Sequence, residues 1–572
     1  MKFLCALCVL CGLVLPAVGL DREAFTFTHY DLNARIEPQQ QRLGVRGKIT
    51  LRNDSDLPQK TAVLQISSTL NWSAVRTDGN PVAFVTQQYT SDIDHTGALS
   101  EAVVVLPRPV SPKQSIDLEI AYEGVIPQDA NRLTRIGVPA DVAKHSDWDQ
   151  IGRSFTALRG IGYVAWYPIA TEAANLSEPS SVSEAVGRWK ERERNSEMRV
   201  IFAHSNSEGI RPSLYCDARA QVLGSEEMGL AYSSQAECGF ESLNSTVPFF
   251  LIADYQALDR AAVNICYLAQ HKSNADDYAV AVDQVAPFLD RWFGDHRARP
   301  EMKAEVLELP DPHASPFASG NVLLTPLALN DTALLLSALR QLTRVTFPSP
   351  RSWIFDGLPL FAQSAYMDHE KGRAAAIAYM ENHRSALLES EKNAGTRDQA
   401  AQHSLINSVD EFYVDAKAMS VWWMLRDIVG ENALIAALHS YRSVNDTRAD
   451  YMQKLIEAQA HRDLSWFFDD WVYRDRGLPD FRIASIYPRQ LAAGGYMVTV
   501  TIDNLGAAAA EVPVTLKMAA TEAGDKLLVP ANSTASIRIQ TPALPEEAVV
   551  NDGSVPETNV SNNTFRLSPE TK

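Results

Sequence analysis

The segment RQLTRVTFPSPRSWIFDGLPLFAQ, residues 340–363, decides how the fold of this chain is interpreted. It begins inside a longer run, DTALLLSALRQLTRVTF (331–347), whose apolar residues recur at helical spacing. The PSPR segment (348–351) then predicts a turn, because proline disfavours a continuing helix. Apolar residues at helical spacing resume after that turn. The stretch therefore predicts two consecutive helices joined by a short connection.

One interpretation of the first helix requires no function at all. Asp331 would cap the start of an amphipathic helix, and Arg340 and Arg344 would lie on its solvated face. Its buried stripe would consist of Leu335, Leu339 and Leu342. Only the sequence on either side of the segment can distinguish this interpretation from a functional one.

The pattern changes twice along the chain. Residues 20–252 contain short runs with alternating apolar residues, separated by turns, which is typical of a β-sandwich. Residues 253–478 are mainly helical in pattern, with a strand-like AEVLELPD (304–311) near their start. Residues 479–572 return to β-type alternation and end in a polar tail. The sequence predicts a multidomain α+β protein with an N-terminal β-sandwich, a mainly helical domain and a C-terminal β-sandwich.

Residues 1–19 are typical of a secretory signal peptide. Lys2 precedes the apolar run FLCALCVLCGLVLPAV (3–18), and Ala17-Val18-Gly19 is a small-x-small cleavage site. The run is short for a membrane span, although an uncleaved anchor stays open as an alternative. We expect a secreted or periplasmic protein without a stable membrane span after cleavage.

Charge and cysteine content narrow the function further. The formal net charge is −18, from 52 Lys and Arg against 70 Asp and Glu. Because such a chain repels a phosphate backbone, we expect no nucleic-acid partner. Outside the first 19 residues the cysteines are Cys216, Cys238 and Cys266. A Cys216–Cys238 disulfide suits an oxidising compartment, and three buried thiols are the alternative.

Several segments, in this order, resemble the aminopeptidase N-like gluzincins, a family of zinc metallopeptidases. They are HYDLNARIEP (29–38), RGKITLRN (46–53), VPFFLIADY (247–255), KAMSVWWMLRDIVG (417–430) and DLSWFFDDWVYRDRGLPDFRI (463–483). The resemblance spans most of the chain and implies a thermolysin-like fold for residues 253–478. It also implies a zinc-dependent peptidase site in that region.

The opening segment resembles the family's zinc site in its frame but not in its ligands. WIFDGL (353–358) matches a Trp-x-x-Glu-Gly frame, which places Asp356 at the third-ligand position. RQLTR (340–344) matches the His-Glu-x-x-His pentad, so Arg340 and Arg344 stand at the two His positions and Gln341 at the catalytic Glu. A second register, with Ser337, Ala338 and Gln341 at these positions, supplies no ligand set either.

These residue types cannot perform the family's chemistry. A guanidinium has no free lone pair and stays protonated, so Arg does not bind zinc. Gln341 has no titratable carboxylate and cannot act as a general base. Asp356 alone does not hold a transition metal, and no two of the 12 His residues stand two or four positions apart. We therefore predict neither zinc nor another cofactor.

The resemblance also identifies altered positions on either side of the former zinc helix. PFASGNVLL (316–324) stands where the family binds the substrate's free amine, with Gly320 in place of a Glu and only Asn321 retained. Asp415 takes the place of the family's transition-state Tyr if Lys417 is the anchor. Tyr413 could serve there only with a shifted helix start.

The sequence therefore predicts a zinc-free pseudo-peptidase that keeps a peptide-binding cleft between domains. Asn321, Arg340 and Arg344 would contact a peptide or protein ligand there. Either arginine would also pair with Asp356, so that a charge pair replaces the ion. Two alternatives stay open: an active metallopeptidase or hydrolase with an altered metal site, and a structural or assembly subunit.

Overall fold

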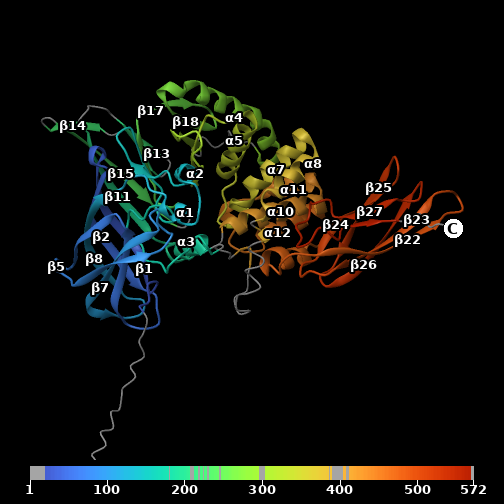
Figure 1. Ribbon diagram of the computed structural model, residues 1–572, viewed down its shortest axis with the longest axis horizontal. Helices are drawn as coiled ribbons and strands as arrows, with labels where there is room; N and C mark the ends of the chain where they lie inside the picture. The colour runs from blue at the N-terminus through green and yellow to red at the C-terminus, as the bar shows by residue number, and fades with distance from the viewer. Residues whose placement is uncertain are drawn as a thin grey trace, which may run out of the picture.

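The structure is a computed structural model. It describes residues 20–178, 181–206, 212–216, 219–222, 224–228, 231–243, 246–294, 303–385, 387–388, 404–406 and 411–567. The expected signal peptide lies outside these ranges. Figure 1 shows the chain as strand-rich N- and C-terminal parts on either side of a helical middle part. The mixed α+β, multidomain character expected from the sequence is confirmed at this level.

The N-terminal part is built on an eight-stranded sheet and a three-stranded sheet. The larger sheet runs in the order β14 (Gly224–Met228), β15 (Ala231–Phe240), β11 (Glu197–Asn206), β1 (Phe25–Glu37), β2 (Arg42–Asn53), β8 (Ser115–Val125), β4 (Leu70–Thr77) and β5 (Asn80–Pro81). The smaller sheet consists of β3 (Gln59–Ser67), β7 (Ala98–Val110) and β6 (Phe84–Thr90). Alternate residues of both sheets, such as Leu32 and Leu64, enter one common core, as period-two patterning requires.

A five-stranded sheet lies beside these two. Its order is β13 (Arg219–Val222), β12 (Ser213–Cys216), β16 (Phe250–Ala253), β10 (Phe155–Leu158) and β9 (Gln150–Ile151). The helices of the N-terminal part are α1 (Asn131–Arg135), α2 (Ala140–Ser146) and α3 (Ser181–Arg192), with a 3-10 turn η1 (Pro38–Gln40) after β1. In Figure 1, α2 and α3 lie on the side of the N-terminal sheets that faces the helical part.

The middle part begins with a mixed five-stranded sheet in the order β17 (Tyr255–Asp259), β18 (Val263–Leu268), β19 (Ala304–Glu308), β21 (Val322–Thr325) and β20 (Phe317–Ser319). The strand expected at 304–311 is thus β19. The main helices are α4 (Lys272–Phe293), α5 (Asp331–Thr346), α6 (Ser352–Phe355), α7 (Gly357–Lys371), α8 (Arg373–Glu381), α10 (Glu411–Val429), α11 (Glu431–Ser440) and α12 (Tyr451–Ala460). Short turns η2 (Ala269–His271), η5 (Ser443–Asn445), α13 (Ser465–Phe468) and η6 (Asp469–Tyr473) complete it.

The C-terminal part pairs a three-stranded with a four-stranded sheet. The first consists of β22 (Phe481–Gln490), β23 (Tyr496–Asn504) and β26 (Ser533–Thr541), and the second of β25 (Glu522–Val529), β24 (Ala510–Lys517), β27 (Glu547–Val550) and β28 (Thr564–Arg566). Part of the expected polar tail is therefore a strand, because β28 pairs with β27. Asn551, Glu557 and Asn563 explain the polarity of this segment, since they are buried and hydrogen bond to one another.

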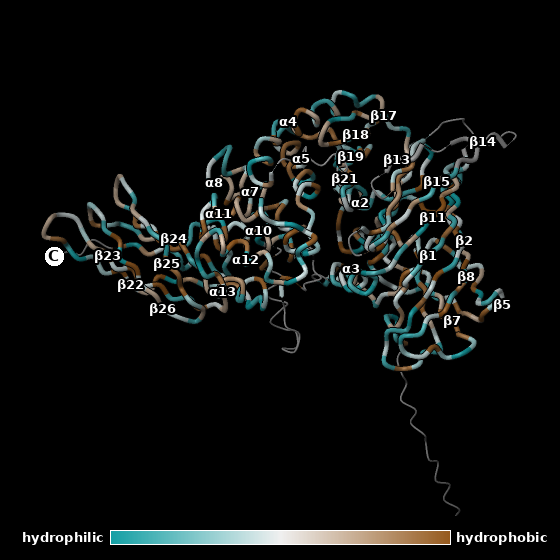
Figure 2. The backbone as a smooth tube through the Cα atoms, turned by 180° about the vertical axis from the view of Figure 1, so that it is seen from behind, coloured by the Kyte–Doolittle hydropathy of each residue, from teal (hydrophilic) through white to brown (hydrophobic). Residues whose placement is uncertain are grey.

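The helical middle part and the C-terminal sheets share one hydrophobic core. Polar contacts accompany that continuity: Trp471 donates its indole N–H to the Ala509 carbonyl at 2.7 Å, and Arg373 pairs with Asp552 at 2.7 Å. Figure 2 shows hydrophobic segments in the interior helices and strands and hydrophilic segments in the outer loops. The two parts are consequently packed as one body rather than joined by a linker.

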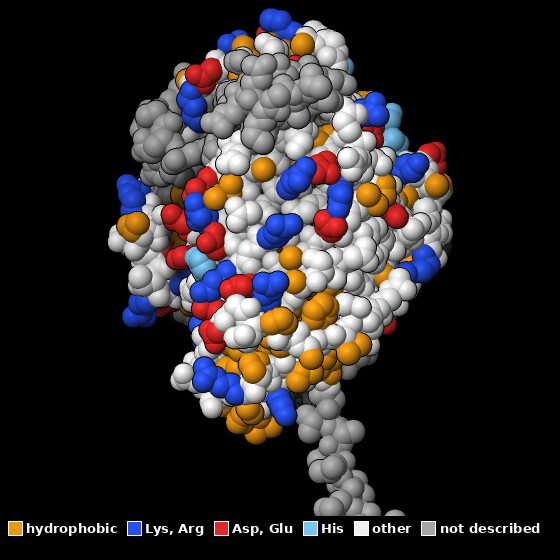
Figure 3. Space-filling model, turned by 90° about the vertical axis from the view of Figure 1, so that its left-hand side faces the viewer, with side chains coloured by type: hydrophobic (Ala, Val, Ile, Leu, Met, Phe, Trp, Pro, Cys, Tyr) orange, Lys and Arg blue, Asp and Glu red, His pale blue; other side chains and the backbone are white. Residues whose placement is uncertain are grey.

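Charged side chains of both signs lie on the surface of the N-terminal part. The N-terminal face in Figure 3 carries basic and acidic side chains that are interspersed rather than gathered into a basic stripe. None of the helices in the described ranges combines the length and the apolarity that a membrane crossing needs.

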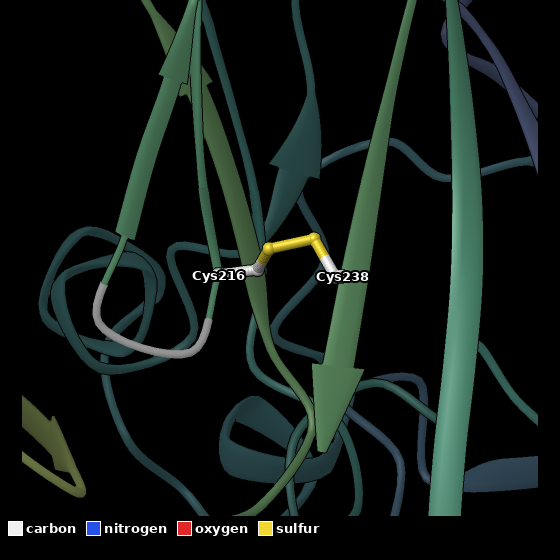
Figure 4. Close-up of a disulfide and its surroundings, with 2 residues drawn as sticks. All are labelled: Cys216 and Cys238. Atoms are coloured by element: carbon white, nitrogen blue, oxygen red, sulfur yellow. A yellow bond between two sulfur atoms is a disulfide. The ribbon is translucent and has the colours of Figure 1, made fainter.

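A disulfide joins two of the N-terminal sheets. Cys216 at the end of β12 and Cys238 on β15 form it with a Cα–Cα distance of 6.1 Å (Figure 4). Of the two alternatives open from the sequence, the bridge is thus the one found. Cys266 on β18 is a buried free thiol, and burial raises its pKa to about 12.

Replacing both Cys216 and Cys238 with Ser should lower the free energy of unfolding by about 3 kcal/mol, because the bridge removes loop-closure entropy from the unfolded chain. Guanidinium denaturation with and without reductant measures the difference. The control is Cys266→Ala, which keeps the bridge and should keep the full effect of the reductant. An unfolding curve of the parent chain that does not respond to reductant would contradict the prediction.

Candidate functional site

The helix α5 begins one residue earlier than its sequence suggests. The side chain of Asn330 accepts a hydrogen bond from the Ala333 amide at 3.0 Å and caps the helix. The prediction that Asp331 is the cap was wrong: Asp331 is the exposed first helical residue. Its carboxylate still lies at the positive end of the helix dipole.

The buried face of α5 is wider than the predicted leucine stripe. Leu339 and Leu342 are buried as expected, but Leu335 is only partly buried. The buried set is Leu334, Ala338, Leu339, Gln341, Leu342, Thr343 and Val345. This breadth follows from the packing of α5 against both α4 and α7, which leaves little of the helix facing solvent.

Arg344 pairs with Asp356, as the sequence predicted. The Nη1 atom of Arg344 lies 3.5 Å from Oδ1 of Asp356, and the guanidinium stacks over the Phe355 ring at 4.4 Å. The Arg344 side chain is only 10% exposed, so the solvated-face interpretation was wrong for this residue. Asp356 lies at the junction of α6 and α7, so the pair connects α5 to the start of α7.

Arg340 pairs with a carboxylate that the sequence had not assigned to it. Its Nη2 atom lies 3.6 Å from Oδ2 of Asp415 on α10, and its side chain is 40% exposed. The arginines one turn apart on α5 therefore contact acidic residues from two different places in the chain. Four of the predicted site residues, Arg340, Arg344, Asp356 and Asp415, come together as two charge pairs.

The charge of Arg340 also acts on the α8 region. Burial lowers the pKa of His383, and the positive charge of Arg340 lowers it further. Burial raises the pKa of Tyr379 to about 12, against the opposing effect of Arg340. Both side chains consequently stay uncharged near neutral pH, and Asp415 is the carboxylate that balances Arg340.

Gln341 and Asn321 form a second contact within the predicted site. Gln341 is 2% exposed and donates from Nε2 to the Asn321 carbonyl at 2.5 Å. Asn321 and Gly320 form the turn between β20 and β21, where Gly320 has a left-handed φ of 57°. The Asn321 side chain donates to the Lys303 carbonyl at 2.9 Å. The predicted general-base and amine-binding positions thus tie α5 to the sheet.

Tyr413 belongs to a different network. Its hydroxyl donates to Asp475 at 2.6 Å and accepts from the ammonium of Lys417 at 3.0 Å. Lys417 is fully buried, pairs with Asp475 and lies 5.2 Å from the Trp471 ring. The structure therefore places Tyr413 in a hydrogen-bonded network with Lys417 and Asp475.

The Trp-x-x-Asp-Gly frame has packing roles. Trp353 stacks on Trp422, with ring centroids 4.9 Å apart, and accepts a hydrogen bond from its indole at 3.2 Å. Trp422 and Trp423 are fully buried. A Cβ on Gly357 would overlap the Cβ of Ala418, so only glycine allows α7 to approach α10 this closely.

The residues present do not fit a zinc ion. Of the three positions that the resemblance assigns to zinc ligands, two are guanidiniums, and the third, Asp356, already accepts from Arg344. Within the described ranges, no three His, Cys, Asp or Glu side chains are grouped so that they could hold a metal. The donor set therefore differs in kind from that of a zinc peptidase.

A cavity that the sequence did not predict lies between the N-terminal part and the start of the middle part. It has a volume of about 980 Å³ and is lined by residues of α2, of β10 and of the chain after β18 and β19. His145, His204 and Asp311 contribute to it, whereas Arg340, Arg344 and Asp356 do not. The alternation of Val200, Phe202 and His204 is a sequence signal that could have placed His204 on the inner face of a strand, but not beside a cavity.

Comparison with known proteins gives a distant structural likeness. No protein-family model and no curated protein sequence matches the chain. A mutant M1 zinc metallopeptidase from Deinococcus radiodurans, solved with a bound Tyr-Ser-Ala substrate, is similar at a TM-score of 0.45 and 15% identity. The match covers 80% of this chain and 96% of that one. At this level the likeness assigns neither an activity nor a metal to this chain.

The Arg344–Asp356 pair should contribute measurably to stability. Asp356→Ala takes away the carboxylate that a largely buried guanidinium contacts, and we expect a loss of about 1–3 kcal/mol, between exposed and fully buried pairs. Chemical denaturation of Asp356→Ala, Arg344→Met and the double variant isolates the coupling between the two side chains. The control is Asp276→Ala, whose pair with Lys272 is 45% and 64% exposed and should cost below about 1 kcal/mol. Equal losses in Asp276→Ala and Asp356→Ala would contradict the prediction.

Gly357→Ala should destabilise the helical part by about 1–3 kcal/mol, because the added methyl group forces α7 and α10 apart. Thermal and chemical unfolding measure the loss. Gly239→Ala is the matched control, since a Cβ at Gly239 meets nothing within 4 Å and its backbone is not left-handed. A stability of Gly357→Ala equal to that of the control would show that the close approach of the helices is not required.

Proposed function

We propose that the chain is a secreted or periplasmic, zinc-free relative of the aminopeptidase N-like metallopeptidases that binds a peptide or protein ligand without hydrolysing it. The observation that carries this proposal is the contact of Arg344 with Asp356. A cation of the chain itself stands where the resemblance would put the ion, and it engages the remaining carboxylate. Arg340 with Asp415 extends the same substitution to the position of the transition-state Tyr.

The chemistry of these groups supports binding over catalysis. None of the groups at the zinc-helix positions is a base: Gln341 does not titrate, and both guanidiniums stay protonated. The carbonyl of Asn321, in the segment that would bind a substrate amine, already accepts from Gln341 and from the Glu305 amide. Removing the zinc machinery while keeping its helices packed leaves a scaffold suited to hold a ligand.

The arginines themselves are poor candidates for the ligand contact. Arg340 and Arg344 were expected to attract a carboxylate of the ligand, but each contacts a carboxylate of its own chain. An alternative metal centre would need a donor group that the described residues do not provide. A ligand would therefore bind away from the former zinc position.

Elemental analysis of the purified protein after dialysis tests the proposal directly. We expect less than about a tenth of an equivalent of zinc, because the former-ligand positions offer one carboxylate at most. An assay with aminoacyl chromogenic substrates should detect no turnover. Stoichiometric zinc together with hydrolysis would replace this proposal with an active metallopeptidase.

Restoring the zinc-binding residues should not restore the enzyme. The variant combines Arg340→His, Gln341→Glu, Arg344→His and Asp356→Glu. It still lacks the amine-binding and oxyanion groups at Gly320 and Asp415, and loss of one oxyanion donor alone costs about 2.7–4 kcal/mol in the transition state. Turnover measured with added zinc, beside the unaltered chain as control, checks this. Efficient hydrolysis would show that the outer positions were misassigned.

A further inference from the structure

The cavity of about 980 Å³ is formed by both the N-terminal and the middle part of the chain. The N-terminal part contributes Lys144, Trp148 and Phe155, and the middle part contributes Leu268 and Leu309. Its volume is at the upper end of the range of about 300–1,000 Å³ that small-ligand pockets occupy. A cavity near the former zinc helices, lined by residues such as His383 and Ala416, measures about 40 Å³ and falls far below that range.

Hydrogen bonds between the N-terminal and the middle part hold the walls of the cavity together. Nδ1 of His145 on α2 lies 2.5 Å from Oδ2 of Asp311 in the loop after β19. Trp148 donates its indole N–H to the Ser315 carbonyl at 2.9 Å, and the Ser315 amide donates to the His145 carbonyl at 2.7 Å. These contacts fix the two walls of the cavity relative to each other.

One buried polar atom in the lining lacks a partner. His204 on β11 is 5% exposed, and its Nδ1 atom has no hydrogen bond within the described ranges. Burial lowers the pKa of His204 to about 4, so the imidazole is neutral near pH 7, with one ring nitrogen that donates and one that accepts. Nδ1 itself has almost no accessible surface, so a ligand in the cavity would reach the imidazole through its other ring nitrogen, Nε2.

Charges of both signs stand around the same cavity. Lys144 and Arg153 are exposed cations, and Asp141 and Asp254 are exposed anions; no salt bridge joins any of the four to another described residue. The acidic residues disfavour a phosphate-bearing ligand, whereas a zwitterion can meet both signs. The rings of Trp148 and Phe155 add apolar surface for a side chain.

We propose that this cavity, and not the former zinc position, is the ligand site, and that it takes a short zwitterionic peptide whose amide hydrogen bonds to the imidazole of His204. The inference rests on the proposed non-hydrolytic function and adds the place and the chemistry of its ligand. Peptide termini meet the charged residues at the rim, and an apolar peptide side chain packs on the aromatic wall.

Affinity selection from a randomised tetrapeptide mixture with free termini, read by mass spectrometry, tests the proposal on the full chain. The unaltered protein should enrich a defined subset, and titration of one enriched peptide should give its Kd. His204→Leu should weaken that Kd by about three- to tenfold, the effect of one hydrogen bond. Arg153→Glu changes only an exposed rim residue and should also weaken it, which keeps the test valid if His204→Leu does not fold.

Asp356→Ala serves as the control at the former zinc position and should bind the enriched peptide as the unaltered chain does. Absence of enrichment, or a Kd that neither His204→Leu nor Arg153→Glu changes, overturns the proposal. A Kd weakened only by Asp356→Ala would move the ligand to the former zinc position and overturn it as well. Peptide fragments in the bound fraction would instead contradict the non-hydrolytic function while leaving the site in place.

Discussion

Two cations on one helix that cannot be neutralised constrain the whole middle part of this protein. A guanidinium is a permanent cation, and the fold that packs α5 among other helices brings a carboxylate to each of Arg340 and Arg344. It does so from two directions, with Asp356 at the start of α7 and Asp415 on α10. Both pairs lie where α5, α7 and α10 pack together, beside the close contact of α7 and α10 at Gly357.

The element types could be predicted from periodicity, but their exact partners could not. Apolar spacing in 331–347 identified α5, yet Asn330 and Asp331 are both good caps, and only the backbone conformation decides between them. Leu335 was expected inside because it lies one turn before Leu339, but the packing of α5 buries the neighbouring Leu334 instead. The Cys216–Cys238 bridge stayed open because the proximity of β12 and β15 depends on how two sheets pack.

The candidate site was predictable only where its residues are close in sequence. Arg344 and Asp356 belong to consecutive helices, and their pairing followed from the frame of the segment. Asp415 comes from a later helix, and no local pattern connects it to Arg340. The same limit applies to His204, whose inward direction is local, while the cavity beside it is created by α2 and by the loop after β19. Non-local packing, not residue chemistry, was the missing information.

The core that the helical part shares with the C-terminal sheets has a consequence for how this protein is inherited and degraded. A module with its own core can be lost, duplicated or exchanged without harm to its neighbours. Here the apolar faces of β22, β23 and β24 complete the burial of the helices, so a break in the chain near residue 479 would expose both surfaces at once. Such fragments are what cellular proteases remove and what aggregates form from. The C-terminal sheets and the helical part are therefore expected to unfold as one cooperative unit.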